Sequence, residues 1–323
     1  MKNNILLAYG FDGNGSGETL DVEDISKHIK DDELAWVHMD VNHHDTKTWL
    51  ENEISYLDPF VVEALLAEET RPRITEIDGG AIIILRGVNL NNNANPEDMI
   101  SIRLWIDNHR IISLQKRQLK AVLDIEEKIK AGKAPKDSGQ FICMLVSRLF
   151  DRMEPALTEL DELTDDVEEK ILENADISLR ESIIDIRKQA IMFRRYMAPQ
   201  RETIGQLRMS DIEWLNNIHK RHLQESYNQV TRYVEDLDAI RERAQIVKDE
   251  LANILADRLN KNMYVLSVIA AIFLPLGFLT GLLGINIGGI PGAENGNAFL
   301  IFCGILSILV AFQVIIFKKL KWF

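Results

Sequence analysis

The chain has 323 residues, enough for two soluble domains and a membrane hairpin, and it carries a formal net charge of −13. This acidity excludes a nucleic-acid-binding protein, whose affinity rests on basic surface, and suits a protein that gathers cations. The two cysteines, Cys143 and Cys303, lie in separate regions, so they predict buried apolar-like side chains rather than a disulfide framework.

Residues 1–136 mix strand and helix patterns and predict a cytoplasmic α/β domain, a sheet with helices on its faces. The N-terminal apolar run, residues 5–8, is too short for the apolar core of a signal peptide. Runs rich in β-branched and aromatic residues predict strands at 34–41, 81–88, 100–106 and 110–114. Helices are expected at 59–69 and 119–131, with a loop at 91–96.

Residues 137–262 show only helical patterns and predict a helical hairpin followed by a stalk. One helix is expected over 141–172. A second is expected from the Ser178-x-x-Glu181 capping box to a stop near Pro199 or Gly205. After a second box at Ser210, one unbroken helix is expected from about residue 211 to 283.

This long helix carries two stripes of residues at a spacing of about 3.5 residues. The apolar stripe needs a partner, either the two preceding helices or copies of itself. Its members are Leu223, Tyr227, Val230, Val234, Leu237, Ala244, Leu251 and Leu255. The other stripe begins acidic and ends small or weakly polar, which is typical of residues that let helices approach closely or line a narrow axis. Its members include Glu235, Glu242, Asp249, Asn253, Asn260, Met263, Ser267, Ala270, Leu274, Gly277 and Gly281.

Two apolar runs without charge, 263–283 and 298–317, are each about as long as a bilayer's hydrocarbon core requires. They predict a transmembrane hairpin over 263–323, with a connecting loop at 284–297. Basic residues flank both spans on the far side from this loop: Arg258, Lys261, Lys318, Lys319 and Lys321. The stretch 287–297 holds a single charge, Glu294, so the positive-inside bias predicts that both termini are cytoplasmic.

Two charged regions of the helical part allow a structural and a functional interpretation. Residues 151–176 hold eleven acids and two basic residues, and residues 177–208 hold seven basic residues and three acids. They predict either a mutually paired hairpin or a cytoplasmic cation sink. His219 and His222, with Glu225 one turn on, share a helix face and offer zinc ligands, or are surface histidines without a role. His43-His44-Asp45 is a weaker candidate of the same kind.

Gly284-Ile285-Asn286 closes the first span. Glycine lets a helix end, and a ring of asparagine amides from several subunits can hold a hydrated divalent ion by its water shell. The motif, with the lysine-rich tail, resembles the Gly-Met-Asn signature of the CorA superfamily of divalent cation transporters. The chain departs from the magnesium channels at Leu283, where they have tyrosine, and at Ile285, where they have methionine. It is similar in these positions to the ZntB zinc-transport branch. Further matches to that branch are residues 68–73, 85–89, 196–201, 273–281 and 287–292.

The resemblance covers nearly the whole chain and implies a CorA-like funnel, a homopentamer in the inner membrane with five first spans around the axis. It implies transport of Zn²⁺, with Co²⁺, Ni²⁺, Cd²⁺ or Mg²⁺ as other possible cargo and no permanently bound cofactor. Gly284, Ile285 and Asn286 would then form the outer filter. Glu294 would gather cations at the outer mouth, or is only a solvated loop acid.

No Asp, Glu, His, Lys or Arg occurs between Met263 and Asn286, so dehydrated zinc would find no replacement ligands. The ion is therefore expected to cross largely hydrated, past constrictions at Leu274 and Met263, and to be received by Asp249, Glu242 and Glu235. The alternatives are a CorA-like magnesium, cobalt or nickel channel, and a membrane-anchored coiled-coil scaffold. No nucleophile triad or phosphate loop appears in the N-terminal domain, so enzymatic activity is not expected.

Overall fold

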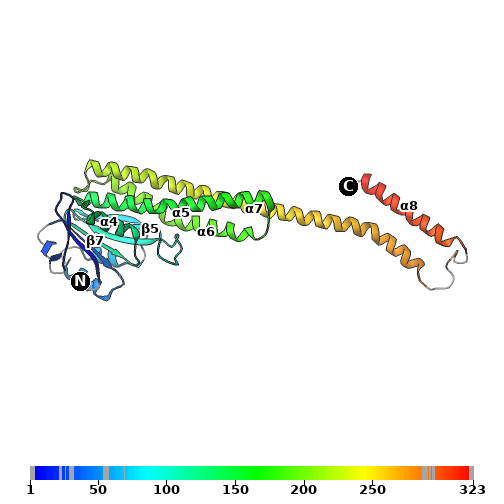
Figure 1. Cartoon of the computed structure of the whole chain (residues 1–323), viewed down its shortest axis with the longest axis horizontal. Helices are drawn as coiled ribbons and strands as arrows, with labels where there is room; N and C mark the ends of the chain where they lie inside the picture. The colour runs from blue at the N-terminus through cyan, green and yellow to red at the C-terminus, as the bar shows by residue number, and fades with distance from the viewer. Residues whose placement is uncertain are drawn as a thin grey trace. The chain divides into compact units, whose positions relative to one another are not determined.

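The fold is that of a computed structural model, which describes residues 4–21, 24–25, 27–28, 33–53, 58–68, 70–285, 290, 292 and 295–319. Its contacts divide the chain into two units that meet between Asp249 and Glu250 (Figure 1). The first unit holds a sheet and its helices, and the second holds two apolar helical segments. Helix α7 (Asn217–Leu283) contributes to both units.

The sheet has seven strands in the order β2-β1-β3-β7-β6-β5-β4. Neighbouring strands are antiparallel except for β3 and β7, which pair in parallel. The strands are β1 (Ile5–Phe11), β2 (Gly17–Thr19), β3 (Ala35–Asp40), β4 (Arg73–Ile77), β5 (Gly80–Gly87), β6 (Ile100–Ile106) and β7 (Arg110–Gln115). The four predicted strands are confirmed as β3, β5, β6 and β7.

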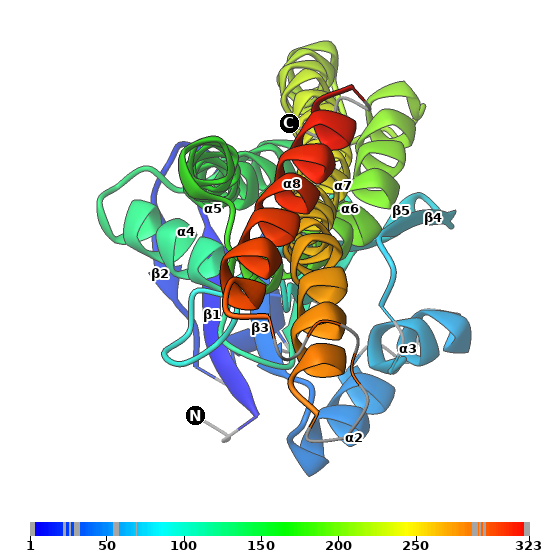
Figure 2. The same ribbon diagram turned by 90° about the vertical axis from the view of Figure 1, so that its right-hand side faces the viewer.

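Helices cover both faces of the sheet, which explains why its central strands are almost entirely buried (Figure 2). On one face lie α2 (His44–Glu53) and α3 (Pro59–Leu66), whose apolar residues join a core cluster with Val37, Ile82 and Ile84. On the other face lie α5 (Ser138–Asn174) and α6 (Leu179–Met209), where the Phe141 ring packs against Trp36 in a tilted arrangement, with the ring centroids 5.1 Å apart. Helix α4 (Lys120–Lys130) packs beside α5.

Three strands and one helix were not expected from the sequence. β4 is an edge strand with charged, exposed positions such as Arg73 and Glu76, so it lacks the apolar pattern that marks a buried strand. β2 is three residues long, and β1 is a short run that ends before a glycine-rich turn. Helix α2 buries only Thr46, Trp49 and Leu50 and has too few apolar residues for a helical stripe.

Helix α6 continues to Met209, so the predicted stop near Pro199 or Gly205 is wrong. A proline inside a helix removes one backbone donor but does not end a helix that packs well. Gly205 lies against α7: an added Cβ would come within 3.1 Å of the Tyr227 ring. Glycine is therefore used here for close helix packing rather than for a turn.

Neither predicted capping box forms. Ser178 has helical backbone angles and makes no side-chain cap, while Asp176 Oδ1 accepts the Ser178 N–H at 2.8 Å. Helix α7 begins at Asn217 rather than near residue 211, because Asn216 Oδ1 accepts the N–H groups of Ile218 (2.8 Å) and His219 (3.1 Å). Asparagine, not serine, begins this helix.

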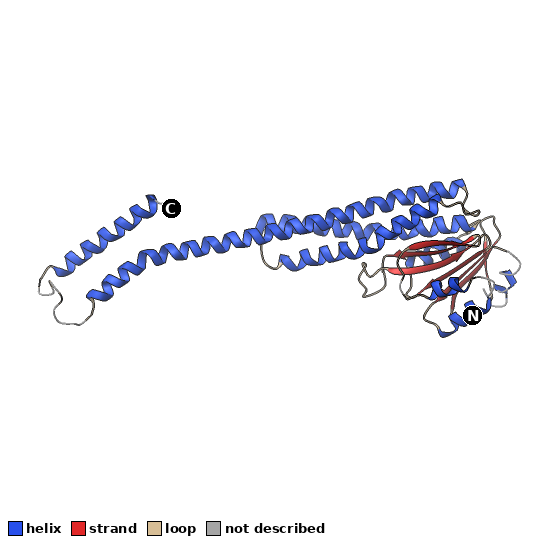
Figure 3. Ribbon diagram, turned by 180° about the vertical axis from the view of Figure 1, so that it is seen from behind, coloured by secondary structure: helices blue, strands red, loops and turns tan. Residues whose placement is uncertain are grey.

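The apolar stripe of α7 packs against the two preceding helices of the same chain, α5 and α6. The three helices lie side by side in Figure 3. Leu223, Val230, Val234, Leu237, Ala244 and Leu251 are buried, and Tyr227 and Leu255 are half-buried. Phe150 of α5 meets Tyr233 edge to face at 6.2 Å, and Arg194 of α6 pairs with Asp238 at 2.6 Å. Of the two expected partners, the structure selects the preceding helices.

The second unit contains the end of α7 and α8 (Ala298–Lys319). These are the two described helices that are long and apolar enough to cross a membrane, and hardly any of their apolar windows is buried within the chain. Both expected spans are therefore present as helices.

Candidate functional site

Gly284 ends helix α7 at the motif that the sequence singles out. Its N–H donates to the carbonyls of Thr280 (2.9 Å) and Gly281 (3.2 Å). A Cβ at this position would lie 2.9 Å from the Thr280 carbonyl oxygen, so glycine is required for this close approach. Ile285 follows and is exposed. Asn286, the third motif residue, and the loop acid Glu294 lie outside the described residues.

Helix α7 turns one side toward α8 and a different side away from it. The covered side consists of the residues of the apolar run 263–283 that are buried or half-buried: Val268, Ala271, Ile272, Pro275, Leu276 and Leu279. The seven predicted pore-lining residues are all exposed: Asn260, Met263, Ser267, Ala270, Leu274, Gly277 and Gly281. At about 100° per residue, the second set lies roughly opposite the first on the helix. The predicted lining face is therefore not used for packing within the chain.

Pro275 and Gln313 are joined by one contact that the sequence did not reveal. Proline has no N–H, so the carbonyl of Ala271, four residues earlier, loses its helical donor. The side-chain amide of Gln313 on α8 donates to that carbonyl at 3.3 Å. The Ala271 carbonyl oxygen therefore does not need water as a partner, because a side chain of the neighbouring helix satisfies it.

Two hydroxyl side chains of the first span, those of Ser267 and Thr280, bond to their own helix. Ser267 Oγ donates to the Met263 carbonyl at 2.8 Å, and Thr280 Oγ1 to the Leu276 carbonyl at 3.0 Å. Neither hydroxyl adds a charged ligand. Between Met263 and Ile285 the described chain therefore offers a passing cation only small, apolar or weakly polar surface.

Three acids predicted to receive the ion, Glu235, Glu242 and Asp249, are exposed on the part of α7 that belongs to the first unit. The side-chain amide of Gln245 donates to both carboxylate oxygens of Asp249 at 2.9 Å. The other two are left open to solvent within a single chain.

His219 and His222 are placed in different environments. His219 is buried: its Nε2 lies 3.2 Å from Asp137 Oδ1, and its Nδ1 accepts the Asn216 N–H at 3.4 Å. Its ring fills the space above Gly139, where a Cβ would come within 2.1 Å of Nδ1. His222 and Glu225 are exposed. Both ring nitrogens of His219 thus have partners within the chain, which supports the structural interpretation of this residue.

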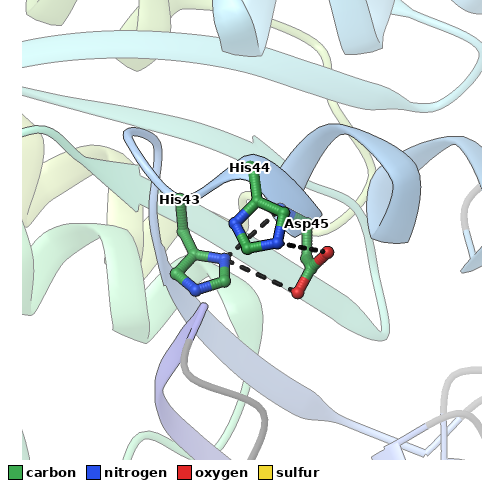
Figure 4. A group of neighbouring side chains, drawn as sticks. All are labelled: His43, His44 and Asp45. Carbon is green, nitrogen blue, oxygen red and sulfur yellow. Dashed lines mark hydrogen bonds and ion pairs between the residues drawn. The ribbon is translucent and has the colours of Figure 1, made fainter.

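His43, His44 and Asp45 form a group with three metal-type ligand atoms within 4.8 Å of one another (Figure 4). His44 Nε2 lies 3.2 Å from Asp45 Oδ1, and His43 Nδ1 lies 3.8 Å from Asp45 Oδ2. The two rings stack at 4.5 Å. The group follows β3 at the start of α2, where His44 and Asp45 are exposed, so it remains a candidate rather than a formed metal site.

Three acids of α5 pair with α7 rather than with α6, the other half of the expected hairpin. Arg243 of α7 bonds Glu168 at 2.7 Å and Asp161 at 2.9 Å, and it also bonds Asp165. These contacts, led by the hydrogen bond to Glu168, raise the pKa of Arg243 above its ordinary value. The counter-charge thus comes from α7 rather than from the basic residues of α6, and it neutralises part of the predicted cation sink.

The cysteines are free thiols, as expected. Cys143 is largely covered, and burial raises the pKa of its thiol to about 12. Its Sγ lies 3.6 Å from the His219 carbonyl oxygen, where the thiol donates. A thiol with so high a pKa is a poor metal ligand and nucleophile at neutral pH.

Comparisons with known proteins match nearly the whole chain, including both units. Residues 31–319 match the family model described as "CorA-like Mg2+ transporter protein". The chain is 35% identical over 321 residues to the "Divalent cation transporter CmaX" of Pseudomonas aeruginosa, covering 98% of this chain and 96% of that protein. It is 33% identical over 317 residues to the "Zinc transport protein ZntB" of Yersinia enterocolitica, covering 98% and 95%. The solved structure of full-length CmaX superposes with a TM-score of 0.86 at 33% identity, covering 100% of this chain and 99% of that one.

Proposed function

Since the chain belongs to the CorA-like Mg2+ transporter family, we propose that it carries a divalent cation, zinc in the first place, across the inner membrane through a homopentameric pore. The observation that carries the proposal is the face of α7 opposite α8. It is uncharged, rich in small residues, unused for packing within the chain, and continuous to Gly284. Five such faces around an axis would line a narrow passage.

Zinc is favoured over magnesium by similarity to ZntB and by the motif residues Leu283 and Ile285. The same site also suits a CorA-like channel for magnesium, cobalt or nickel, because nothing between Met263 and Ile285 coordinates a metal directly. Selection must then depend on the size and hydration of the ion.

The ion crosses this passage with its water shell. A ring of Asn286 amides holds the hydrated ion at the outer end, where Gly284 lets the backbone turn. Below it the ion passes Gly281 and Gly277, where an added Cβ would meet no atom of the chain within 4 Å. Leu274 and Met263 form apolar constrictions that close by dewetting.

Acids at both ends of the passage concentrate the cation. Glu294 lies on the outer loop, and Asp249, Glu242 and Glu235 lie on the cytoplasmic part of α7. Rings of carboxylates raise the local cation concentration and so the rate of entry. With Arg258, Lys261, Lys318 and Lys319 beside the membrane, both termini face the cytoplasm.

The test is metal flux into proteoliposomes loaded with a fluorescent indicator, comparing zinc, cobalt, nickel and magnesium with and without a pH gradient. The Asn286→Ala variant should reduce flux of every carried metal to that of empty vesicles. Asn262→Ala is the matched control, since Asn262 lies on α7 outside the lining set, and it should transport normally. Normal flux through Asn286→Ala would refute the filter assignment. No flux of any metal through the unmodified protein would favour a membrane-anchored scaffold.

A further inference from the structure

A basic pocket lies in the first unit, away from the proposed pore, where β5 and β6 meet α6 and the chain that follows α3. Its volume is about 310 Å³. The residues that matter are Thr70, Arg86, Ser101, Arg103, Lys116 and Arg117. Four cations line it against two carboxylates, Glu68 and Asp98, so its charge is opposite in sign to that of the chain as a whole.

Arg103 is the innermost cation and has little compensation. Only 3% of the residue is exposed. Its Nη1 donates to the Leu65 carbonyl at 3.2 Å, and its Nε has no hydrogen-bond partner among the described residues. Burial, and then the charge of Arg86, lower the pKa of Arg103. Because a guanidinium keeps its charge in proteins, a buried one without a counter-ion is costly.

Arg86 brings a second guanidinium to the same side of the sheet. The strand register pairs Ile84 with Arg103 and Arg86 with Ser101, so Arg86 and Arg103 point to one face. Arg86 donates to the carbonyls of Thr70 (2.9 Å) and Met99 (2.6 Å) and to Thr70 Oγ1 (2.8 Å). Its guanidinium also lies over the ring of Tyr196 at 3.9 Å.

All of these partners of Arg86 are neutral. They fix the guanidinium in place without cancelling its charge. The pocket thus holds two ordered guanidinium groups, neither of which forms an ion pair with a described carboxylate, a set that leaves out Glu69.

We infer that this pocket binds a phosphate dianion, either free phosphate or the phosphate group of a small ester. Planar guanidinium groups suit phosphate oxygens because they donate two parallel hydrogen bonds. The hydroxyls of Thr70 and Ser101 add neutral donors, and Lys116 and Arg117 at the exposed rim attract the anion. A dianion would supply two negative charges to these arginines, of which Arg103 is buried and Arg86 half-buried.

The experiment measures binding to the full-length protein in detergent by calorimetry. Inorganic phosphate is compared with glycerol 3-phosphate, and potassium chloride at matched ionic strength serves as reference. Arg103→Met removes the buried charge at similar volume and should weaken phosphate binding about tenfold or more. Lys116→Ala/Arg117→Ala changes only the exposed rim and should weaken it severalfold. Arg152→Met, on α5 and paired with Asp124, is the control and should bind as the unmodified protein does.

A thermal unfolding scan gives a second readout. Without phosphate, Arg103→Met should unfold at the same or a higher temperature than the unmodified protein, because it removes an uncompensated charge. With phosphate, the unmodified protein and Arg152→Met should gain the same stability, and Arg103→Met should gain the least. Tighter binding of glycerol 3-phosphate would identify an ester as the ligand, and equal or weaker binding would identify free phosphate.

Three results would overturn the inference: equal shifts with chloride and phosphate, unchanged affinity in Arg103→Met, or no phosphate binding at all. The last would indicate that a carboxylate, such as one from a second copy of the chain, neutralises the arginines. The measurement does not involve metal transport, so its outcome is independent of the proposed pore.

Discussion

The two units of this chain differ in how the apolar surface of helix α7 is covered. In the first unit the apolar stripe of α7 is buried by α5 and α6, and charged side chains such as Arg243 and Asp238 tie the three helices together. In the second unit α7 and α8 cover only one side of each other, and residues such as Phe273, Leu274 and Phe278 are exposed. The first unit is completed by contacts within one chain. The second leaves much of its apolar surface uncovered within one chain, as expected of helices that face lipid and other copies in the proposed pore.

The largest effect on stability is expected at a fully buried histidine of the first unit. His38 is fully buried, with Nδ1 2.7 Å from Ser113 Oγ, and burial lowers its pKa to about 4. The pKa of His38 in the folded state is below its value in the unfolded state. Above about pH 6.5 the side chain is neutral in both states, so its burial does not make stability depend on pH there. Between pH 6.5 and 4 the unfolded state binds the proton first, and stability falls by about 3 kcal/mol in all.

A His38→Gln variant should lose this part of the pH dependence while keeping a hydrogen-bonding side chain. Thermal unfolding followed at pH 7.5, 6.0 and 4.5 checks the prediction. His44→Gln, an exposed histidine in the same unit, is the control and should leave the pH profile unchanged. If the unfolding temperatures of His38→Gln and of the unmodified protein changed with pH in the same way, the His38 side chain would be accessible to solvent in the folded state.

A smaller effect is expected at the charged contact between α5 and α7. Arg243→Met leaves Asp161, Asp165 and Glu168 without their shared cation and should destabilise the first unit by about 1–2 kcal/mol. Denaturant unfolding of the full-length protein in detergent measures this. The matched control is Arg241→Met, which removes a more exposed partner of Asp238 and should cost less than about 0.5 kcal/mol. Equal costs would show that the α5–α7 network adds nothing beyond an ordinary surface pair.

The smallest effect concerns the second unit. Gln313→Leu removes the donor to the Ala271 carbonyl and should cost about 0.6–1 kcal/mol, the usual size of a hydrogen bond between membrane helices. In a Pro275→Ala background the helix regains its own N–H at residue 275, so the same change should cost almost nothing. Unfolding of the four proteins in micelles gives this double-mutant cycle. Additive costs would show that Gln313 does not compensate for the proline.

The contrast between the units also explains what the sequence could predict. Strands β5 and β6 and the spans at the chain's end are continuous apolar runs, and their patterns alone mark them. The charged edge strand β4 and the sparsely apolar helix α2 depend on neighbours distant in sequence, so no local pattern marks them. The stop expected near Pro199 was wrong because tertiary packing outweighs the loss of one backbone hydrogen bond.

At the candidate site, helical spacing predicted a lining face of α7. Its seven members are exposed within one chain, and their place around a pore stays a prediction. The Gln313–Ala271 contact had a signal in the sequence, since a proline always leaves a free carbonyl four residues before it. What the sequence lacked was the identity of the donor, which depends on the alignment of α7 with α8. That Arg86 and Arg103 point to the same face of the sheet likewise depends on strand register.

One side chain on α6 has a consequence for how this protein behaves at high concentration. β4 pairs with β5 only as far as Ile84, which leaves the backbone of Arg86 without a neighbouring strand on that side. The amide of Gln200, itself buried, accepts the Arg86 N–H at 2.6 Å and donates to the Arg86 carbonyl at 3.0 Å. An edge whose polar groups are already engaged cannot template a strand from another molecule. A single glutamine thus keeps this stretch of β5 from pairing with a strand of another molecule.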